Sequence, residues 1–446
     1  MKVKINYPFY YYFAIIFFVI ISVFFWWIVF NNFSNGRYFS QQEIDYRQDK
    51  SVHVLQPINQ NDLIIDSIAN RRIVSNLVNI ALKNKSKDIY QFANELKKVY
   101  KDSTYQIVYL DSVINRLQVK LPDLDREIFK NEVKKNMKND SLLVWDEMIF
   151  ESTNNNVIIN NEEAPFMNQI DIQNAWRTTL GTKKTIIAVI DNGFDTQHES
   201  LRGKDIKSYN VISKTNQVNP SSQNHGTHVA SIAVGNSNSY QGICPNCSYM
   251  PIKVEDENGN MSMSYVIDAI LYAVKNKAAV INLSLGSEIP LELGNLSLQQ
   301  QKEVINSDAS DLQEFWNDLF LYANERNSIC VIAAGNSSVL TGLDAFQRSK
   351  QTIKVGTVSR KNTIASFSNF GDYNTIYAPG EEIYGAKPNN QYEYLDGTSM
   401  SAPIVSGFIG LIKSKFPNYK FDDVMSLLMK NTEIVNNITQ LRIKSI

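Results

Sequence analysis

The chain has 446 residues, with 44 basic and 45 acidic side chains and a formal net charge of −1. A protein that binds nucleic acid by neutralising phosphates normally carries a basic excess or a basic stripe, so this balance argues against a nucleic-acid partner. Hydrophobic residues make up 43% of the chain, which is enough to bury a substantial core and excludes intrinsic disorder of the whole chain. Three cysteines are too few for a disulfide framework.

The chain begins with one long apolar run. No Lys, Arg, Asp or Glu occurs between Lys4 and Arg37, and residues 9–30 are almost entirely apolar. A run of this length can cross a hydrocarbon core, which needs about 20 residues. Because Lys2 and Lys4 precede it, the positive-inside rule predicts a cytoplasmic N-terminus, a single membrane anchor and an extracytoplasmic remainder.

A cleaved secretory signal is the alternative interpretation of this run. Such signals usually have an apolar stretch of about 7 to 15 residues followed by small residues at the cleavage site. The run here is longer, and no such site follows it, which favours an uncleaved anchor. Both interpretations export the bulk of the chain.

The region after the apolar run predicts a small structure of mixed helices and strands, without a set of catalytic side chains. Apolar residues recur at helical spacing in its first half, and shorter strand-like segments follow. The predicted elements are helices over 73–81 and 89–100, strands over 105–110 and 115–121, a helix over 122–137 and a strand over 142–150. The last four form a β-β-α-β unit.

Beyond residue 165, short apolar runs end in polar residues. A buried strand is predicted over 185–190, and Asp191 follows it, at the end of a strand where ligands and chemistry gather in open parallel sheets. His225 and His228 open a helix, whose N-terminus disfavours a charged imidazolium and so keeps a ring able to act as a base. Two histidines could also bind a metal, but no third ligand follows at a zinc-site spacing, so no metal is predicted.

Two further segments place a polar residue just after a strand or at the start of a helix. A strand over 329–333 leads to Asn336, whose amide can stabilise charge on a carbonyl oxygen, although a structural Gly-Asn turn explains it as well. Ser399 lies at the start of a helix, where its backbone N–H can bind an oxyanion. If these strand ends and helix starts share one edge of a doubly wound parallel sheet, they bring together a nucleophile, a base, a group that orients the base and an oxyanion donor.

The chain resembles the subtilisin family of serine peptidases. The resemblance rests on the blocks IIAVIDNGFD, HGTHVA, LSLG, AAGN and GTSMSAP, which occur in this order between about residues 165 and 430. It implies an α/β fold with a doubly wound, mostly parallel sheet and helices on both faces. It also implies a serine endopeptidase with an acyl-enzyme intermediate, the alternative being a catalytically inactive subtilase fold that serves as a binding or scaffold module.

The resemblance assigns roles to individual residues. Ser399 attacks the scissile carbonyl, His225 transfers the proton and Asp191 orients the imidazole. Asn336 and the Ser399 N–H form the oxyanion hole. The substrate backbone pairs with an edge strand that also forms one wall of the pocket for the residue before the cleaved bond. This first wall consists of Ser284, Leu285 and Gly286. The second wall consists of Ala333, Ala334 and Gly335.

Three features depart from the usual family pattern. Ser200 occupies the position of an Asp that binds calcium in many members, so neither this calcium nor any other cofactor is predicted. Cys244 and Cys247 are as consistent with a local disulfide as with two buried thiols. A polar insert from Glu288 to about Asp311 leaves the substrate-binding strand, and we expect it to overhang the cleft and narrow specificity.

The sequence therefore predicts three parts: a cytoplasmic tip and transmembrane signal-anchor over 1–37, a helical and α+β propeptide-like region over 38–155, and a peptidase domain over 156–446. We expect residues 101–150 to act as an intramolecular chaperone and inhibitor that is cut between about 150 and 165. A permanent spacer between membrane and enzyme is the alternative. The expected partners are an extended polypeptide substrate and, through residues 9–30, the cell membrane.

Overall fold

The computed structural model describes residues 46–66, 71–84, 86–100, 105–121, 126–137, 141–152, 155–157, 166–220, 224–287, 289, 291–307 and 311–446. From Lys50 to Ile446 the chain forms one compact unit. The predicted membrane span over 9–30 lies outside the described residues. Within the described ranges, no helix combines the length and the apolar character that a membrane crossing requires.

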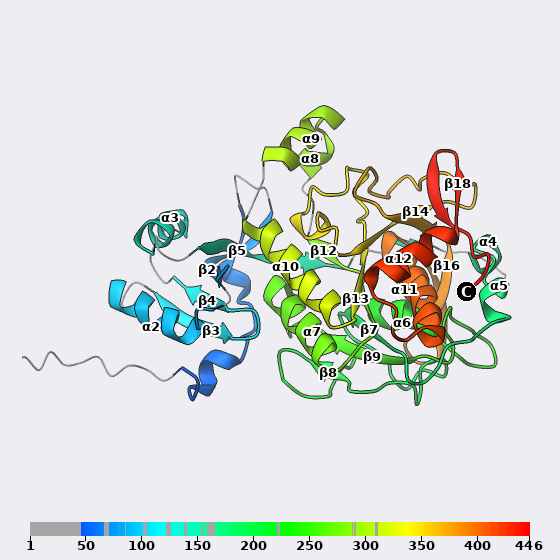
Figure 1. Cartoon of the computed structure of the whole chain (residues 1–446), viewed down its shortest axis with the longest axis horizontal. Coiled ribbons are helices and arrows are strands. Elements are labelled where there is room, and N and C mark those ends of the chain that lie inside the picture. The colour runs from blue at the N-terminus through cyan, green and yellow to red at the C-terminus, as the bar shows by residue number, and fades with distance from the viewer. Residues whose placement is uncertain are drawn as a thin grey trace, which may run out of the picture. The chain divides into compact units, whose positions relative to one another are not determined.

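The first part of the compact unit is a small antiparallel sheet with two helices (Figure 1). Its strands lie in the order β5-β2-β4-β3, which together with the order of elements is the arrangement of a ferredoxin-like β-α-β-β-α-β fold. The predicted β-β-α-β unit is confirmed. The elements are β2 (Arg72–Leu82), α2 (Ile89–Val99), β3 (Gln106–Asp111), β4 (Arg116–Lys120), α3 (Arg126–Asn136) and β5 (Leu142–Glu151), and the short strand β1 (Leu63–Ile65) pairs with β2.

The prediction of a helix over 73–81 is wrong, because these residues form the long strand β2. This strand pairs with β4 on one side and with β5 on the other, and its register with β5 shifts between Ile73 and Val78. An irregularity of this kind changes which side chains face the core. The apolar residues on either side of the shift therefore lose the strict alternation of a strand and mimic the spacing of a helix.

The second part of the unit is built on a nine-stranded sheet with helices on both faces (Figure 1). The strand order is β18-β19-β15-β14-β13-β11-β7-β9-β8, and among these described strands only β18 and β19 pair antiparallel. The predicted doubly wound, mostly parallel sheet is confirmed. Its strands are β7 (Ile186–Asp191), β8 (Tyr209–Asn210), β9 (Ser248–Lys253), β11 (Val280–Leu283), β13 (Ile329–Ala333), β14 (Ile353–Val358), β15 (Ile376–Pro379), β18 (Thr432–Val435) and β19 (Ile438–Leu441).

Two buried apolar cores hold the helices against this sheet. One core includes the buried faces of α6 (His225–Val234) and α11 (Thr398–Lys415), and the other those of α7 (Met263–Lys275) and α10 (Asp311–Glu325). The chain passes from β7 to β9 on one side and then crosses back to β11 on the other side of β7. In sheets of this kind, the site lies at the carboxyl ends of the strands where the winding direction reverses. Further helices of this part are α4 (Phe166–Gln169), α5 (Gln173–Trp176) and α12 (Phe421–Lys430).

Strand β5 connects the two parts of the unit. Besides β2, it pairs antiparallel with two short strands of the second part, β10 (Met261–Ser262) and β12 (Gly286–Ser287). Beyond β5, strand β6 (Asn155–Val157) pairs with β17 (Gln391–Asp396), which in turn pairs with β16 (Ile383–Lys387). The boundary predicted between residues 155 and 156 falls inside β6.

Aromatic side chains fill the contact between β5 and the helices of the second part. Trp145 packs on Phe315 of α10 with ring centroids 4.3 Å apart, and Phe150 lies edge-on to Phe346 at 5.2 Å. These side chains belong to the same buried core as α7 and α10. The small sheet is thus joined to the larger domain by a continuous apolar core.

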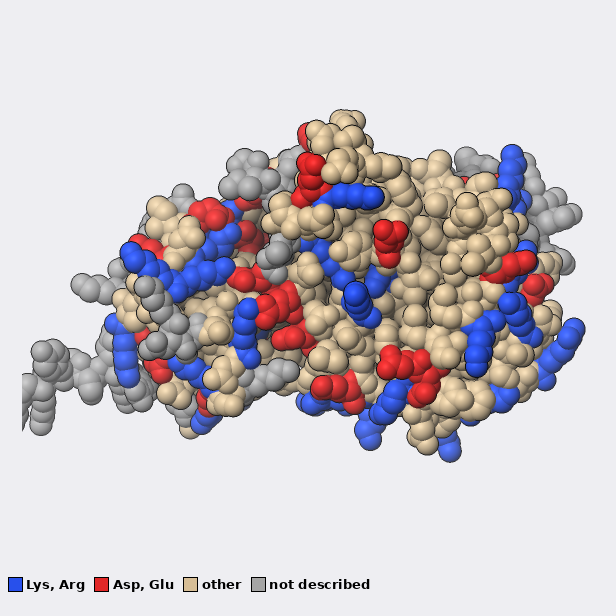
Figure 2. All heavy atoms as spheres, turned by 45° about the horizontal axis from the view of Figure 1, so that its top comes forward, with Lys and Arg blue, Asp and Glu red and all other residues tan. Residues whose placement is uncertain are grey.

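The outer surface carries charges of both signs. Figure 2 shows acidic and basic side chains interspersed on the face that it draws.

Cys244 and Cys247 form a disulfide, which decides between the two interpretations that the sequence left open. Both residues are buried. Gly181 passes directly over the bridge with a φ of +93°, and a Cβ there would lie 2.4 Å from Cys244 Sγ. Only glycine fits this close approach and this backbone conformation. The third cysteine, Cys330, is buried as a free thiol in β13.

A buried carboxylate, Glu147 of β5, caps the start of helix α7. Its Oε1 accepts the backbone N–H of Ser264 at 2.9 Å, and its Oε2 accepts the Ser264 hydroxyl at 2.7 Å. Two further donors on the small sheet, the amides of Asn79 and Gln118, also bind Oε2. A negative charge at the N-terminus of a helix is stabilised by the helix dipole, so this group joins the two parts of the unit electrostatically.

We predict that Glu147→Ala lowers the free energy of unfolding by about 3 kcal/mol, because several buried donors lose their acceptor together. Chemical denaturation of the Ser399→Ala chain, with and without the substitution, measures this loss. Glu147→Gln is the matched control, since it keeps one oxygen acceptor and should lose less. Equal stability of Glu147→Ala and the parent chain would contradict the assigned role.

Candidate active site

Asp191 and His225 meet at the carboxyl edge of the sheet. Asp191 is the last residue of β7, and His225 is the first residue of α6. The imidazole Nδ1 lies 2.8 Å from Asp191 Oδ1 and 3.0 Å from Oδ2, and both side chains are fully buried. A Cβ on Gly226 would lie 2.4 Å from the carbonyl oxygen of Gly193, so this glycine is what lets α6 approach β7 closely enough for the pair to form.

Asn192 ties the two members of this pair together. Its backbone N–H donates to Asp191 Oδ1 at 2.8 Å, and its side-chain oxygen accepts the N–H of Gly226 at 3.1 Å. The end of β7 and the start of α6 are thereby fixed to each other. Asn192 follows the predicted carboxylate directly in the sequence, yet its second contact depends on the fold and could not be predicted from the chain.

Ser399 lies in the first turn of α11, and its hydroxyl donates to the carbonyl oxygen of Ser284 at 3.2 Å. His225 Nε2 is buried and has no hydrogen-bond partner, so the bond between nucleophile and base is not made in this structure. Catalytic hydrogen bonds often form only when substrate is bound. The hydroxyl has to leave Ser284 before it can donate to His225.

The turn that carries Ser399 is held by a second contact with Ser284. Pro403 lies within α11 and lacks the N–H that would bind the carbonyl oxygen of Ser399, four residues earlier. This carbonyl accepts the hydroxyl of Ser284 instead, at 2.8 Å. Ser284 thus binds both the backbone and the side chain of Ser399, a role different from the substrate pairing that the resemblance implies for it.

Asn336 is oriented by Thr398. The Asn336 side-chain oxygen accepts the Thr398 N–H at 2.9 Å and the Thr398 hydroxyl at 2.8 Å. Because the oxygen is used in this way, the amide nitrogen lies on the other side of the group. The backbone N–H of Ser399 belongs to the first turn of α11, where helix N–H groups have no partner within the helix. Asn336 and Ser399 line the same cavity.

This cavity, which we call the specificity cavity, lies between the two predicted walls. Leu285 and Gly286 line one side, and Ala333 and Gly335 line the other. Ala334 is buried behind the second wall, where its carbonyl oxygen accepts the amides of Gln347 and Asn369, each at 2.9 Å. The remaining lining residues are Glu151, Ser287, Ile289, Ser337, Asp344, Gln347, Asn369, Thr398 and Ser399, together with Asn336.

Among the lining residues that sequence reasoning missed are Asp344, Gln347, Asn369 and Thr398. Thr398 was visible as part of GTSMSAP, but its bond to Asn336 depends on two segments meeting in space. The other three lie in the connections after β13 and β14, Gln347 at the end of a short 3-10 helix, and these connections contain no recognisable motif. A buried polar side chain in an irregular loop gives no periodic signal, so the fold is needed to find it.

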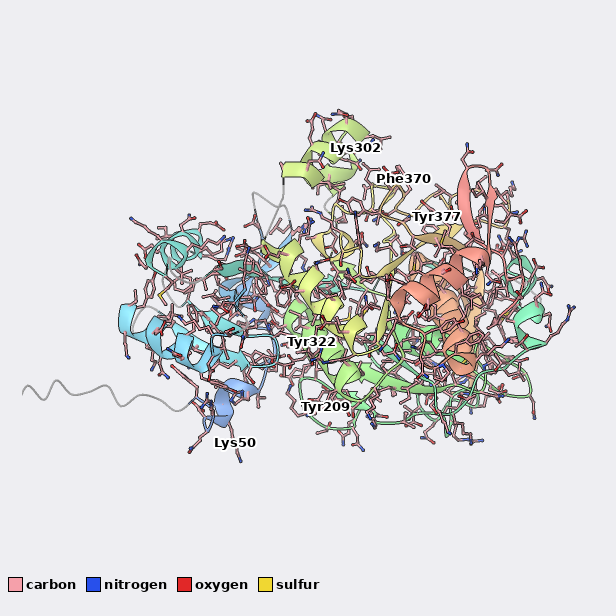
Figure 3. The ribbon with its side chains drawn as sticks, viewed as in Figure 1. Lys50, Tyr209, Lys302, Tyr322, Phe370 and Tyr377 are labelled. Carbon is pink, nitrogen blue, oxygen red and sulfur yellow. A yellow bond between two sulfur atoms is a disulfide. The ribbon has the colours of Figure 1, made fainter. Side chains whose placement is uncertain are left out.

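The polar insert packs beside the specificity cavity. It contains the helices α8 (Leu291–Gly294) and α9 (Leu298–Ser307), and Figure 3 places Lys302 of α9 near Phe370. Gln301 is buried and its side-chain oxygen accepts the N–H of Leu340 at 2.9 Å, while Ile305 packs on Val339 and Leu340. Ile289, just before α8, lines the cavity itself.

The other buried histidines have structural partners. His228 Nε2 lies 3.3 Å from the carbonyl oxygen of Glu393, and burial, followed by the nearby His225, lowers the pKa of His228 to about 3. The ring is therefore neutral at physiological pH. His198 Nδ1 lies 2.9 Å from the hydroxyl of Ser200, the residue that stands where the resemblance implies a calcium-binding Asp.

One cluster of three acidic groups in the described ranges has the spacing of metal ligands: Asp66, Glu127 and Asp146. Arg126 forms ion pairs with Asp66 at 2.5 Å and with Asp146 at 2.7 Å, and Lys130 reaches Glu127 and Asp146. The cluster already has two cations within it. We therefore interpret it as an ion-pair network of the small sheet.

Comparison with known proteins identifies the family of this chain. A family profile described as the Subtilase family matches residues 182–443, more than half of the chain. The chain belongs to the subtilase family. It is 36% identical to the thermophilic serine proteinase of Bacillus sp. (strain AK1) over 55% of this chain and 56% of that protein, and 32% identical to thermitase of Thermoactinomyces vulgaris over 55% of this chain and 81% of that protein.

Two solved structures share the fold over a larger part of the chain than the family profile matches. The epidermin leader peptide processing serine protease of Staphylococcus aureus, solved as a serine-to-alanine mutant, superposes with a TM-score of 0.66 at 21% identity, over 83% of this chain and 98% of that one. Fervidolysin from Fervidobacterium pennivorans superposes with a TM-score of 0.67 at 20% identity, over 88% of this chain and 62% of that one.

We predict that Asn336→Ala lowers kcat by about 100- to 1000-fold with little change in KM, as loss of one oxyanion donor does. Steady-state hydrolysis of a fluorogenic peptide measures both constants. Asn336→Asp is the matched control: it keeps the acceptor for Thr398 but loses the amide donor, so it should be as slow as the alanine variant. If Asn336→Asp kept wild-type kcat, Asn336 would serve only to hold Thr398.

Proposed function

We propose that this protein is a serine endopeptidase that hydrolyses peptide bonds through an acyl-enzyme intermediate. The observation that carries the proposal is the buried Asp191–His225 pair at the same sheet edge as Ser399 and Asn336. The names of the relatives agree, since two of them are described as a thermophilic serine proteinase and thermitase. The chain spans 56% of the first of these, so its own activity is a proposal.

Each group has one role in the proposed reaction. His225 takes the hydroxyl proton of Ser399 as the oxygen attacks the scissile carbonyl, and the Asp191 carboxylate at Nδ1 fixes the ring and stabilises the imidazolium that forms. Asn336 and the Ser399 N–H donate to the oxyanion. His225 then gives its proton to the leaving amine. A water molecule, activated by His225 in the same way, attacks the acyl-enzyme and releases the acyl group.

The substrate is an extended polypeptide that adds as a strand between β10 and β12. The pairing of β5 supports this, because Phe150 lies opposite both Met261 of β10 and Ser287 of β12. Main-chain pairing of this kind supplies affinity with little demand on sequence, and pockets supply the selectivity. The chain's own β5 holds the place that a substrate takes.

The N-terminal region acts as an intramolecular inhibitor that is removed by self-cleavage. Glu151 pairs with Gly286, two residues beyond Ser284, whose carbonyl contacts the Ser399 hydroxyl. Asn155 pairs with Asp396, three residues before Ser399. Two anchor points of one continuous chain thus lie on either side of the nucleophile. This supports a cut between residues 151 and 155, within the window that the sequence predicts.

The proposed location is the outer face of a cell membrane, with residues 9–30 as the single anchor. This part of the proposal rests on the sequence: the length of the apolar run and the two lysines before it. Tethering confines the peptidase to substrates at or near the membrane surface.

We predict that a fluorophosphonate probe labels the wild-type protein and that Ser399→Ala abolishes the labelling. The probe reacts with an activated serine, so it reports the nucleophile without any assumption about substrate. In-gel fluorescence and mass spectrometry of the labelled peptide measure the result. Absence of labelling in processed wild-type protein would instead favour the inactive scaffold, for which the bond from Ser399 to Ser284 in place of His225 is the supporting observation.

We predict a new N-terminus between residues 152 and 155 in purified wild-type protein, and an intact chain in Ser399→Ala. N-terminal sequencing of both proteins after expression in the same cells measures this. Added catalytic amounts of wild-type enzyme control for cleavage in trans. Identical N-termini in the two proteins would show that another protease removes the region, or that the region is a permanent spacer.

A further inference from the structure

A buried carboxylate lines the specificity cavity. Asp344 is 2% exposed and lies in the loop before the short 3-10 helix Ala345–Gln347. A Cβ placed on Gly286 would lie 3.7 Å from Asp344 Oδ2, so the carboxylate lies directly behind the wall that the substrate backbone follows. The proposed catalytic steps do not use Asp344.

The hydrogen bonds of Asp344 leave room for a ligand. Oδ2 accepts the N–H of Ser287 at 2.9 Å, and Oδ1 accepts the N–H of Phe346 at 3.0 Å. A carboxylate offers about four acceptor positions, so each oxygen keeps a second one. Within the described ranges, no Lys or Arg forms an ion pair with Asp344.

Two amide side chains of the cavity are already engaged, whereas the Ser287 hydroxyl, which is uncharged, has no partner. Gln347 donates to the carbonyl oxygens of Ala333 and Ala334, and Asn369 donates to Ala334. The Asn369 side-chain oxygen accepts the N–H groups of Ser337 and Val339. Among the described side chains, Asp344 is therefore the charged group of the cavity that lacks a counter-ion. Glu151 also reaches the cavity, but it is paired with Arg72 at 2.8 Å and departs with the N-terminal region after cleavage.

We propose that Asp344 makes the specificity cavity selective for a lysine or arginine side chain at the residue before the cleaved bond. A buried charge is costly unless it is paired, and a basic substrate side chain supplies the missing partner. The walls suit such a side chain, because Leu285 and Ala333 cover its aliphatic stem while its cationic end reaches the carboxylate. This inference rests on the proposed peptidase function and names its substrate class.

The chain's own junction is compatible with this selectivity. A new N-terminus between residues 152 and 155 places Glu151, Ser152, Thr153 or Asn154 before the cleaved bond, so self-cleavage takes place without the ion pair. A segment tethered on both sides of Ser399 reacts intramolecularly, and its high effective concentration replaces the binding energy that a separate substrate needs. Substrates in trans lack this advantage and depend on Asp344.

The test compares fluorogenic peptides that differ only in the residue before the cleaved bond: Arg, Lys, Leu and Phe. In processed wild-type enzyme we expect kcat/KM to be about 100-fold higher for Arg and Lys, the scale of a buried charge pair. Asp344→Asn should remove this preference, so that kcat/KM for the Arg and Lys peptides falls to that for the Leu and Phe peptides. Benzamidine, a small amidinium, should inhibit the wild type competitively and lose its effect on Asp344→Asn.

Three controls separate this inference from its alternatives. Asp344→Ser keeps a hydroxyl acceptor for one backbone N–H and should behave like Asp344→Asn if the charge is what matters. Asp372→Asn removes one charge from an exposed residue of the neighbouring loop and should keep the preference. Fluorophosphonate labelling and thermal stability of each variant report whether the site and the fold are intact.

The outcomes are distinct. If all variants are labelled and the wild type cleaves equally well after Leu and after Arg, the selectivity assigned to Asp344 is overturned. The proposed peptidase function is not affected by this result. A uniform loss across all four peptides in Asp344→Asn and Asp344→Ser, with lower thermal stability, overturns the inference in favour of a structural role for Asp344. Absence of both labelling and cleavage in the wild type overturns the proposed function itself.

Discussion

The arrangement of the site depends on the close approach of helix α6 to the end of strand β7. The parallel sheet delivers Asp191 to its carboxyl edge, but the hydrogen bond to His225 forms only because the residue after the histidine has no side chain. Asn192 then fixes strand to helix from the other direction. Helix α11 packs beside α6 in the same core. Because α6 is fixed to the end of β7, this packing brings the first turn of α11, which carries Ser399, to the same edge of the sheet.

A second principle is that backbone groups left unpaired by the fold are reused. Pro403 removes a helical donor, and the carbonyl that it frees binds Ser284. At the start of α11, the Thr398 N–H donates to the side-chain oxygen of Asn336, and the next N–H, that of Ser399, is the one proposed for the oxyanion. The start of α7 is capped by a carboxylate from a different part of the chain, Glu147. Each case couples two segments that are distant in sequence. The contacts that complete the local backbone hydrogen bonding are therefore also the contacts that assemble the site.

The sequence predicted what depends on local order. The strands that end at Asp191 and Ala333 and the helices that begin at His225 and Thr398 were all visible as apolar runs followed by special residues. The error over 73–81 has a physical cause, since the register shift in β2 disguises a strand as a helix. Asp344 and Gln347 could not be predicted, because nothing in an irregular loop shows which of its polar side chains the fold will bury against a cavity.

The dual membership of β5 has a consequence for the mature protein. Within the described ranges, β5 is the strand that pairs with both β10 and β12, so the proposed removal of β5 would open two sheet edges at once and withdraw apolar Phe150 from between them. Unpaired edges of this kind attract any extended chain, including that of a neighbouring molecule. On the proposed cleavage, the newly cut enzyme would be prone to pair with itself, and a peptide bound at these edges, whether substrate or the released segment, would protect it from aggregation.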